Sequence, residues 1–383
     1  MKKRLIIYTS VFLALLAPDI SVRAQEEPEN LYARSAVLMD ADTGRILYEK
    51  NGEEVLPMAS TTKIMTLLVT LENADLEGTV TVSSYAASMP DVQLNIREGE
   101  RYRLKDLCYS MMLESHNDAA AAIAEHVGGS VEGFASMMNQ KARDLGCYHT
   151  YFITPNGLDA EDEYGVHSTT AEDLARIMRF CMQNDTFLSI TREPSWNFTD
   201  LDGTRSFTVN NKNAFLNMME GALTGKTGFT NDAGYCYVGA LEREGKRLIV
   251  ALLACGWPGN RTWKWSDTQT LMNYGLDTYH HETVGEEMIR MEPAAVQDGR
   301  KESVELRADI GTVQMLLKED DLFRIETDRP SELQAPVEAG EIVGTVAYYL
   351  NNEIVDIFPV YAAETVQKID YWWCLNRILQ KWI

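Results

Sequence analysis

The sequence predicts an α+β protein in two parts: a larger mixed body, then a small all-β domain and an amphipathic terminal helix. Helical patterns fill the middle of the body, while strand-like segments lie near both of its ends. This arrangement favours helices packed on one antiparallel sheet. After about Gly285, short β segments separated by Gly, Asp and Pro replace the mixture. The length beyond the N-terminal segment, roughly 360 residues, suits one large domain plus a smaller one.

Residues 1–24 are typical of a cleaved export signal. Residues 2–4 are basic, residues 5–17 form a short apolar run, and Val22-Arg23-Ala24 is a plausible cleavage site. The apolar run is too short for a membrane-spanning helix. We therefore expect an exported protein.

The charge balance is strongly acidic. The formal charge is −22, and removing residues 1–24 takes away four positive charges and one negative charge, which leaves −25. Nucleic-acid binding needs a basic surface, so no nucleic-acid partner is expected. The acidity fits a soluble extracytoplasmic body.

The cysteine pattern gives no support for a metal site or another cofactor. No Cys-x-x-Cys pair or Cys/His cluster occurs. Export would permit disulfides, but the sequence alone cannot pair Cys236 with Cys255, which fall in neighbouring predicted strands. Scattered buried thiols are the preferred interpretation for all six residues: Cys108, Cys147, Cys181, Cys236, Cys255 and Cys374.

The first half of the body begins with strands and continues with helices. Residues 35–50 predict a hairpin that turns at Asp42-Thr43-Gly44. A helix follows from Ser60 to about Asn73, and short strands and turns over 77–107 lead into a second helix, Leu104 to Leu113.

Two further helices follow, one from Asp118 to Gly128 and one that Ser130 caps and Gly146 ends. A further helix opens at 167–173, where Thr169 and Glu172 form a capping box. Capping explains these residues without a catalytic role, so His167 is not expected to be catalytic.

The second half of the body is predicted to be mainly β structure. Residues 187–255 have a strand-like pattern, with a clear hairpin over 235–254 that turns at Glu244-Gly245-Lys246. Arg261 to Tyr279 is predicted to be helical again.

The C-terminal tail, residues 364–383, predicts an amphipathic helix. At 100° per residue, apolar side chains gather on one side and polar ones on the other, with Trp373 and Cys374 as exceptions. An apolar face that carries Trp, opposite a basic polar face, is typical of a helix lying on a membrane surface. Packing on its own domain is the alternative.

The first indication of a catalytic site is the segment Ser60-Thr61-Thr62-Lys63. A Ser and a Lys three residues apart share one helix face. An ammonium there would lower the pKa of the hydroxyl, and an amine neutralised by burial would accept its proton. Pro57 and Ser60 suit a helix entry, whose positive end favours developing anionic charge.

Two further motifs follow in a fixed order. Ser115-His116-Asn117 lies between two helical patterns, and Lys226-Thr227-Gly228 lies in a strand-like stretch. Ser-x-x-Lys, Ser-x-Asn and Lys-Thr-Gly together are the pattern of penicillin-binding proteins and serine β-lactamases.

The surrounding residues resemble serine D-alanyl-D-alanine carboxypeptidases, the low-molecular-mass penicillin-binding proteins. Met58 and His116 depart from the usual family pattern. The resemblance extends from about Tyr32 to the C-terminus and is carried by five segments: residues 40–44, 57–66, 115–119, 154–159 and 225–230.

The resemblance implies a penicillin-binding-protein/β-lactamase-like transpeptidase fold. It implies a catalytic domain over 30–284, a small β domain over 285–363 and a membrane-anchoring helix over 364–383. The expected partners are peptidoglycan stem peptides, β-lactam antibiotics and the membrane surface at the extracytoplasmic face of the bacterial cytoplasmic membrane.

The resemblance also implies a role for each motif residue. Ser60 would be the acylating nucleophile and Lys63 its base, while Ser115 would relay a proton and Asn117 would hold Lys63 and the substrate amide. Lys226 and Thr227 would bind the terminal carboxylate, with Arg261 as a second contact. Gly228 would belong to the same substrate-binding strand, and the N–H groups of Ser60 and Phe229 would stabilise the oxyanion.

Two alternatives remain open. Glu193-Pro194-Ser195-Trp196-Asn197 mimics the Glu-x-x-x-Asn element of class A β-lactamases, although its position among predicted strands argues against that activity. A catalytically silent wall-binding homologue is the other alternative, but Ser60, Lys63 and Lys226 are all present.

Overall fold

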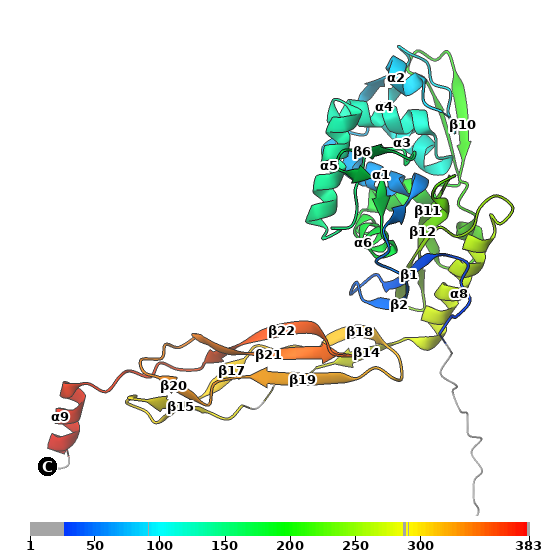
Figure 1. Ribbon diagram of the computed structural model, residues 1–383. Coiled ribbons are helices and arrows are strands. Elements are labelled where there is room, and N and C mark those ends of the chain that lie inside the picture. The colour runs from blue at the N-terminus through cyan, green and yellow to red at the C-terminus, as the bar shows by residue number, and fades with distance from the viewer. Residues whose placement is uncertain (1–26, 91, 286–288, 290, 381–383) are drawn as a thin grey trace, which may run out of the picture.

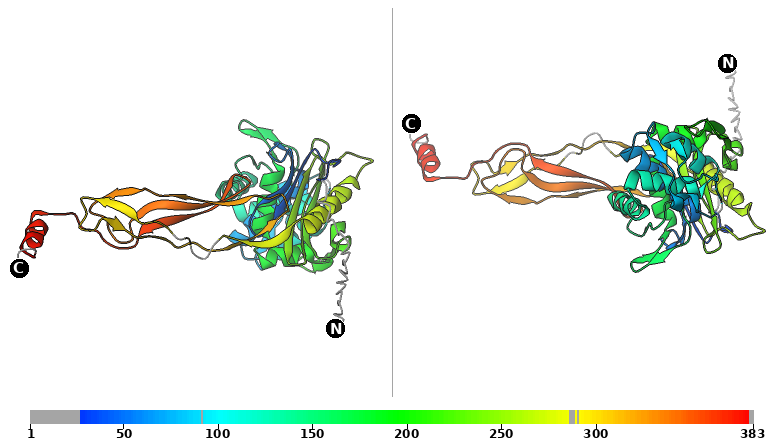
Figure 2. Two further views of the ribbon diagram at one scale, coloured as in Figure 1. Left: turned by 90° about the horizontal axis from the view of Figure 1, so that it is seen from below. Right: turned by 90° about the horizontal axis from the view of Figure 1, so that it is seen from above.

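The computed structural model describes residues 27–90, 92–285, 289 and 291–380. The predicted export signal lies outside these residues. Figure 1 shows a mixed body, an elongated β module extending from it, and a helix at the far tip of the module. The two views of Figure 2 show the same order from body to C-terminal helix. The predicted α+β class with an all-β appendage is confirmed.

One antiparallel sheet joins the two ends of the body's chain. N-terminal strand β1 (Ser35–Asp40) pairs with β13 (Lys246–Leu253). Strand β11 (Ala222–Thr230) lies at the sheet edge next to β12 (Gly234–Arg243), so its outer backbone groups have no strand partner in the sheet. The full order is β11-β12-β13-β1-β2, with β2 at Ile46–Lys50. Both predicted hairpins are confirmed, because β1 also pairs with β2 and β12 pairs with β13.

The sheet separates two hydrophobic cores because side chains alternate along its strands. In β1, Ala36 and Leu38 face the core under helix α8 (Trp263–Thr278), whereas Val37 and Met39 face the helical side. Elements of the helical side are η1 Ala59–Thr62, α1 Lys63–Asn73, α3 Leu104–Leu113, α4 Asn117–Gly128, α5 Val131–Asp144, α6 Ala171–Cys181 and α7 Asp185–Arg192.

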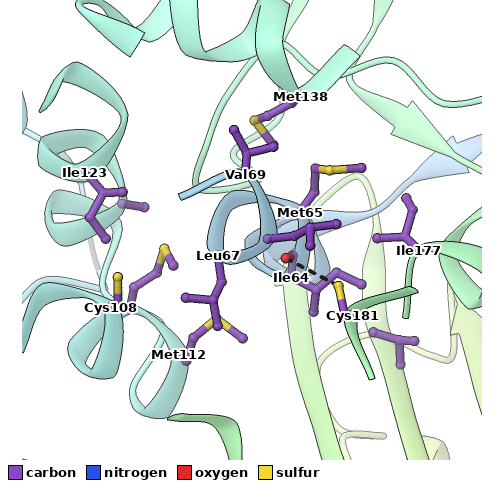
Figure 3. Close-up of a cluster of buried hydrophobic side chains, with 14 of the residues drawn as sticks. Ile64, Met65, Leu67, Val69, Cys108, Met112, Ile123, Met138, Ile177 and Cys181 are labelled. Carbon is purple, nitrogen blue, oxygen red and sulfur yellow. Dashed lines mark hydrogen bonds between the residues drawn. The ribbon is translucent and has the colours of Figure 1, made fainter. Parts of the chain in front are cut away.

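Helix α1 is the central helix of the body. Every residue from Lys63 to Thr70 is buried, as expected of a helix that is apolar on all sides. Figure 3 shows side chains of α1 in one buried cluster with residues of four surrounding helices: Cys108 and Met112 of α3, Ile123 of α4, Met138 of α5, and Ile177 and Cys181 of α6. This packing fixes the N-terminal end of α1, where Lys63 lies.

Two local predictions were wrong. The N-cap of α6 is Thr170, whose hydroxyl accepts from the Asp173 N–H; the Thr169 hydroxyl bonds Thr150 instead. Residues 187–192, predicted to begin a strand region, belong to helix α7. The Asn184 side chain caps α7 by accepting two backbone N–H groups, and this local signal outweighs the β-branched residues that follow it.

The remaining short elements connect these parts. They are β3 Leu56–Pro57, β4 Thr79–Thr81, α2 Ser84–Ala87, β5 Arg101–Arg103, β6 Glu161–Asp162, β7 Gly165–Val166, β8 Ser168–Thr169, β9 Ser195–Thr199, β10 Ser206–Asn210 and η2 Ala214–Asn217.

The β module has its own core, which includes Val296, Val346 and Val360. Its four-stranded sheet has the order β17-β22-β21-β19. The strands after the body are β14 His280–Val284, β15 Ala294–Gln297, β16 Ser303–Val304, β17 Leu306–Ala308, β18 Val313–Leu317, β19 Phe323–Asp328, β20 Glu332–Gln334, β21 Ile342–Leu350 and β22 Glu353–Ala362.

The terminal helix α9 (Tyr371–Gln380) begins later than residue 364, the predicted boundary. Residues 364–369 belong structurally to the β module, because Val366 pairs with Val337 in its core and Lys368 pairs with Gly299. Asp370 then accepts the Trp373 N–H at the start of α9. No helix among the described residues is long and apolar enough to cross a membrane.

All six cysteines lie within the described residues and are free thiols. Five are buried, as predicted. The prediction was wrong for Cys374, which is exposed because no residue of α9 is buried. Burial raises the pKa of the Cys147 and Cys236 thiols to about 12.

Candidate active site

Ser60 lies on a tight turn that two glycines make possible. A Cβ on Gly228 of β11 would lie 2.9 Å from the Ser60 nitrogen, and one on Gly157 would collide with the Ala59 carbonyl oxygen. Ala59 has a left-handed φ of 47°, a strained conformation for alanine that persists only where the surroundings enforce it. The turn is therefore held between the sheet edge and the 154–158 loop.

The Lys63 amine connects three parts of the site. It lies 2.7 Å from Ser60 Oγ and donates to Asn117 Oδ1 at 2.9 Å and to the Asn156 carbonyl at 2.6 Å. Ser60 Oγ also donates to the Asn156 carbonyl at 3.2 Å. Burial, and secondly the Lys226 charge, lower the pKa of Lys63 well below its ordinary value, which favours the neutral amine.

Lys226 connects the other two motifs. Its amine donates to Ser115 Oγ at 2.9 Å and to the Thr227 carbonyl at 2.8 Å. The side chain is buried, which lowers the pKa of Lys226 to about 7. Ser115 has a φ of 69°, a second strained residue at the site.

A groove of about 580 Å³ opens beside these residues. Ser60, Ser115, Thr227, Gly228 and Phe229 line it, whereas Lys63, Asn117 and Lys226 lie buried behind that lining. The structure thus brings all eight predicted site residues to one place. The other lining residues are Val92, Lys212, Ala214, Tyr235, Arg261, Thr262, Lys264 and Trp265.

Sequence reasoning missed the Asn156 carbonyl, which accepts from both Ser60 and Lys63. Residues 154–159 carried part of the family resemblance, but no side-chain pattern marks a backbone acceptor. It also missed Tyr235 and Trp265, because their place in the groove depends on the packing of β12 against α8.

The remaining residues discussed in the sequence analysis differ in whether they line the groove. Arg261 is exposed and lines the groove. Glu193 and Asn197 do not, and Asn197 lies in β9, where its side chain accepts from Thr208. His116 and His167 are buried and do not line the groove either.

A serine hydroxyl beside a buried lysine amine defines a serine acyl-transfer centre. A model of the D-alanyl-D-alanine carboxypeptidase family matches residues 21–255, and a model of the C-terminal domain of penicillin-binding protein 5 matches residues 284–368. Because the first match covers more than half of the chain, the chain belongs to the D-alanyl-D-alanine carboxypeptidase family.

Similar proteins support this assignment. The D-alanyl-D-alanine carboxypeptidase DacF of Bacillus subtilis is 28% identical over 357 residues, 91% of this chain and 90% of DacF. DacB2 of Mycobacterium tuberculosis is 34% identical over 255 residues, 66% of this chain and 85% of DacB2. The predicted family and serine-type enzyme class are confirmed, and the β-lactamase alternative is not favoured.

The solved structure of penicillin-binding protein 5 from Haemophilus influenzae shows the same fold. It superposes with a TM-score of 0.71 at 24% identity and covers 90% of this chain and 100% of its own. The predicted penicillin-binding-protein-like fold is confirmed.

The buried Lys226 amine predicts a pH dependence of stability. Between about pH 7 and the ordinary lysine value of 10.5, the unfolded chain binds a proton that the folded chain releases. The free energy of unfolding should therefore rise with pH in this window, by at most about 1.4 kcal/mol per pH unit from this group. Urea unfolding of Lys226→Gln should show a shallower rise than the wild type. Equal slopes for the two proteins would contradict the lowered pKa.

Proposed function

We propose that the protein is an exported serine D-alanyl-D-alanine carboxypeptidase. It removes the terminal D-Ala from peptidoglycan stem pentapeptides through a Ser60 acyl-enzyme, and penicillin acylates the same serine. The observation that carries this proposal is the 2.7 Å contact between Ser60 Oγ and a buried Lys63 amine.

Neutral Lys63 has the right hydrogen-bonding capacity for a base. A neutral amine has two N–H groups, which suffice for the Asn117 and Asn156 oxygens, and its lone pair is left for the Ser60 proton. The Ser60 hydroxyl must first rotate its proton away from the Asn156 carbonyl, which is 3.2 Å away, toward the Lys63 nitrogen at 2.7 Å. Ser60 attacks the carbonyl of the penultimate D-Ala while its proton passes to Lys63. The burial that lowers the pKa of Lys63 thus favours the basic form of the amine that this step needs.

The substrate lies along the free edge of β11 in this proposal. An extended peptide can add to a sheet edge through its backbone, and β11 occupies that edge. The N–H groups of Ser60 and Phe229 hold the oxyanion; losing one such donor typically costs about 2.7–4 kcal/mol of transition-state stabilisation. Gly228 lets the strand approach Ser60 closely enough for both donors to converge.

The leaving D-Ala takes its proton through Ser115, whose hydroxyl contacts Lys226. Its carboxylate is bound by the Lys226 charge, by Thr227 and by Arg261, the last two of which line the groove. Water then hydrolyses the acyl-enzyme. The Glu193–Asn197 element of the β-lactamase alternative lies outside the groove lining. The contacts of Lys63 with Ser60 and of Lys226 with Ser115 argue against a silent homologue.

Acylation of Ser60 is the direct test of this function. Fluorescent penicillin should label the wild type, and mass spectrometry should locate the adduct on the peptide containing Ser60. Ser60→Ala should abolish labelling, and Lys63→Ala should abolish acylation while the circular-dichroism spectrum stays folded. An adduct on another residue, or undiminished labelling of Ser60→Ala, would disprove the proposed nucleophile.

Carboxylate recognition by Lys226 predicts a substrate-dependent loss. Lys226→Gln should reduce kcat/KM on peptides ending in D-Ala-D-Ala far more than on the same peptides with an amidated C-terminus, because the amide lacks the charge that Lys226 attracts. Lys141→Gln, which removes a lysine paired with Glu72 away from the groove, is the control. Equal losses on both substrates would show that Lys226 does not recognise the carboxylate and acts only through its contact with Ser115.

We further propose that α9 attaches the exported enzyme to the outer face of the cytoplasmic membrane. No residue of α9 is buried, and Tyr371, Trp372, Ile378 and Leu379 are more than half exposed. This exposure argues against the alternative that the helix packs on its own domain. Each large apolar side chain buried in the interface would contribute on the order of 1.5–3 kcal/mol, less the cost of ordering the helix.

The attachment predicts that α9 is needed for binding to liposomes. A chain ending at Asp370 keeps Val366 in the β-module core, and should stay in the supernatant of a liposome sedimentation assay while retaining activity on soluble peptides. Leu379→Glu in the full mature chain should also reduce sedimentation, because it places a charge on the apolar side. Gln380→Glu adds the same charge on the polar side and is the control. If the shortened chain sediments as well as the full chain, the anchor lies elsewhere.

A further inference from the structure

His167 lies outside the groove, yet it contacts both chain segments that hold the reacting atoms. The residue is 2% exposed, and its ring lies against the 59–62 turn that carries Ser60. On one side, Nε2 is 2.8 Å from Thr62 Oγ1. On the other, Nδ1 accepts the backbone N–H groups of Ile153 at 2.9 Å and Thr154 at 3.3 Å. Capping of α6, the role suggested by the sequence, does not involve this ring.

The direction of each hydrogen bond follows from these partners. Nδ1 accepts from N–H groups, so it carries no proton. Burial lowers the pKa of His167 to about 3, so the ring is neutral and its single proton is on Nε2. That proton is donated to Thr62 Oγ1, and the Thr62 hydroxyl donates in turn to the Ala59 carbonyl at 2.8 Å. The chain of donors therefore ends on the strained residue that precedes Ser60.

The second side of the ring leads to the base. Ile153 and Thr154 begin the loop whose Asn156 carbonyl accepts from Lys63. The Thr154 hydroxyl also accepts the Gly157 N–H at 3.2 Å, and Gly157 packs directly on the Ala59 carbonyl. One imidazole thus fixes the Ser60 turn relative to the carbonyl that orients the Lys63 amine.

We propose that His167 is a positioning residue for acyl transfer. As the neutral Nε2–H tautomer, it contacts the Ser60 turn through Thr62 and fixes the position of that turn relative to the Asn156 loop. This inference rests on the proposed function, because it assigns a role in acylation of Ser60. It predicts that loss of the relay slows the acylation step without weakening the binding of penicillin in the groove.

The test measures acylation by fluorescent penicillin under single-turnover conditions. Thr62→Val should lower the limiting acylation rate about tenfold, as expected for loss of one hydrogen bond near the reacting atoms, with little change in the half-saturating concentration. Thr62→Ser should restore the rate. Thr70→Val is the matched control, since it removes a buried hydroxyl of α1 that donates to the Thr66 carbonyl.

A double-mutant cycle separates the relay from general packing. His167→Asn cannot reach Thr62, so it should slow acylation about as much as Thr62→Val, and the double variant should be no slower. Additive losses, or wild-type rates in both single variants, would overturn the proposal. If His167→Asn does not fold, the Thr62→Val, Thr62→Ser and Thr70→Val series still decides.

A spectroscopic measurement tests the tautomer directly. The ¹⁵N shifts of His167 in the wild type should show a protonated Nε2 and an unprotonated Nδ1, unchanged between pH 5 and 9. A proton on Nδ1, or titration in this range, would overturn the inference. If the wild type is not acylated at all, the proposed function fails, whereas normal acylation in every variant rejects only the role of His167.

Discussion

The active site depends on burial of the Lys63 amine. An amine without water must find its hydrogen-bond partners in the protein, and here they are Ser60, Asn117 and the Asn156 carbonyl, each from a different segment. Placing that amine correctly requires α1 to be packed on all sides. It also requires two glycines where the sheet edge and a loop close on the nucleophile. The reactive state of the site is therefore a property of the folded core.

Much of this arrangement was predictable because its signals are local. The Ser-x-x-Lys spacing places two side chains on one helix face, and period-two patterns mark the hairpins that form the central sheet. The order of the three motifs gave the residues that converge around the Lys63 amine. The same local physics predicted the helix of 104–113 to the residue.

The wrong and missing predictions have several physical causes. The Asn156 carbonyl is a backbone group, so no side-chain pattern points to it. The N-cap of α6 falls one residue after Thr169 because two threonines compete for that position and the fold uses the first for a contact with Thr150. Residues 187–192 form α7 because Asn184 caps them. The sequence alone also left open whether α9 packs on its own domain, because that depends on how the β module ends, and in the folded chain no residue of α9 is buried.

The thiol distribution has a practical consequence. Five cysteines are buried, and the burial raises the pKa of each of their thiols. A maleimide, which reacts with accessible thiolate, would therefore select Cys374 on α9 in the folded protein. The natural chain can carry a single fluorophore on its terminal helix without any substitution. Its emission would report whether that helix is in water or in lipid. The acyl-transfer site would remain chemically untouched, because it belongs to the body, which lies at the other end of the molecule from the C-terminal helix (Figure 2).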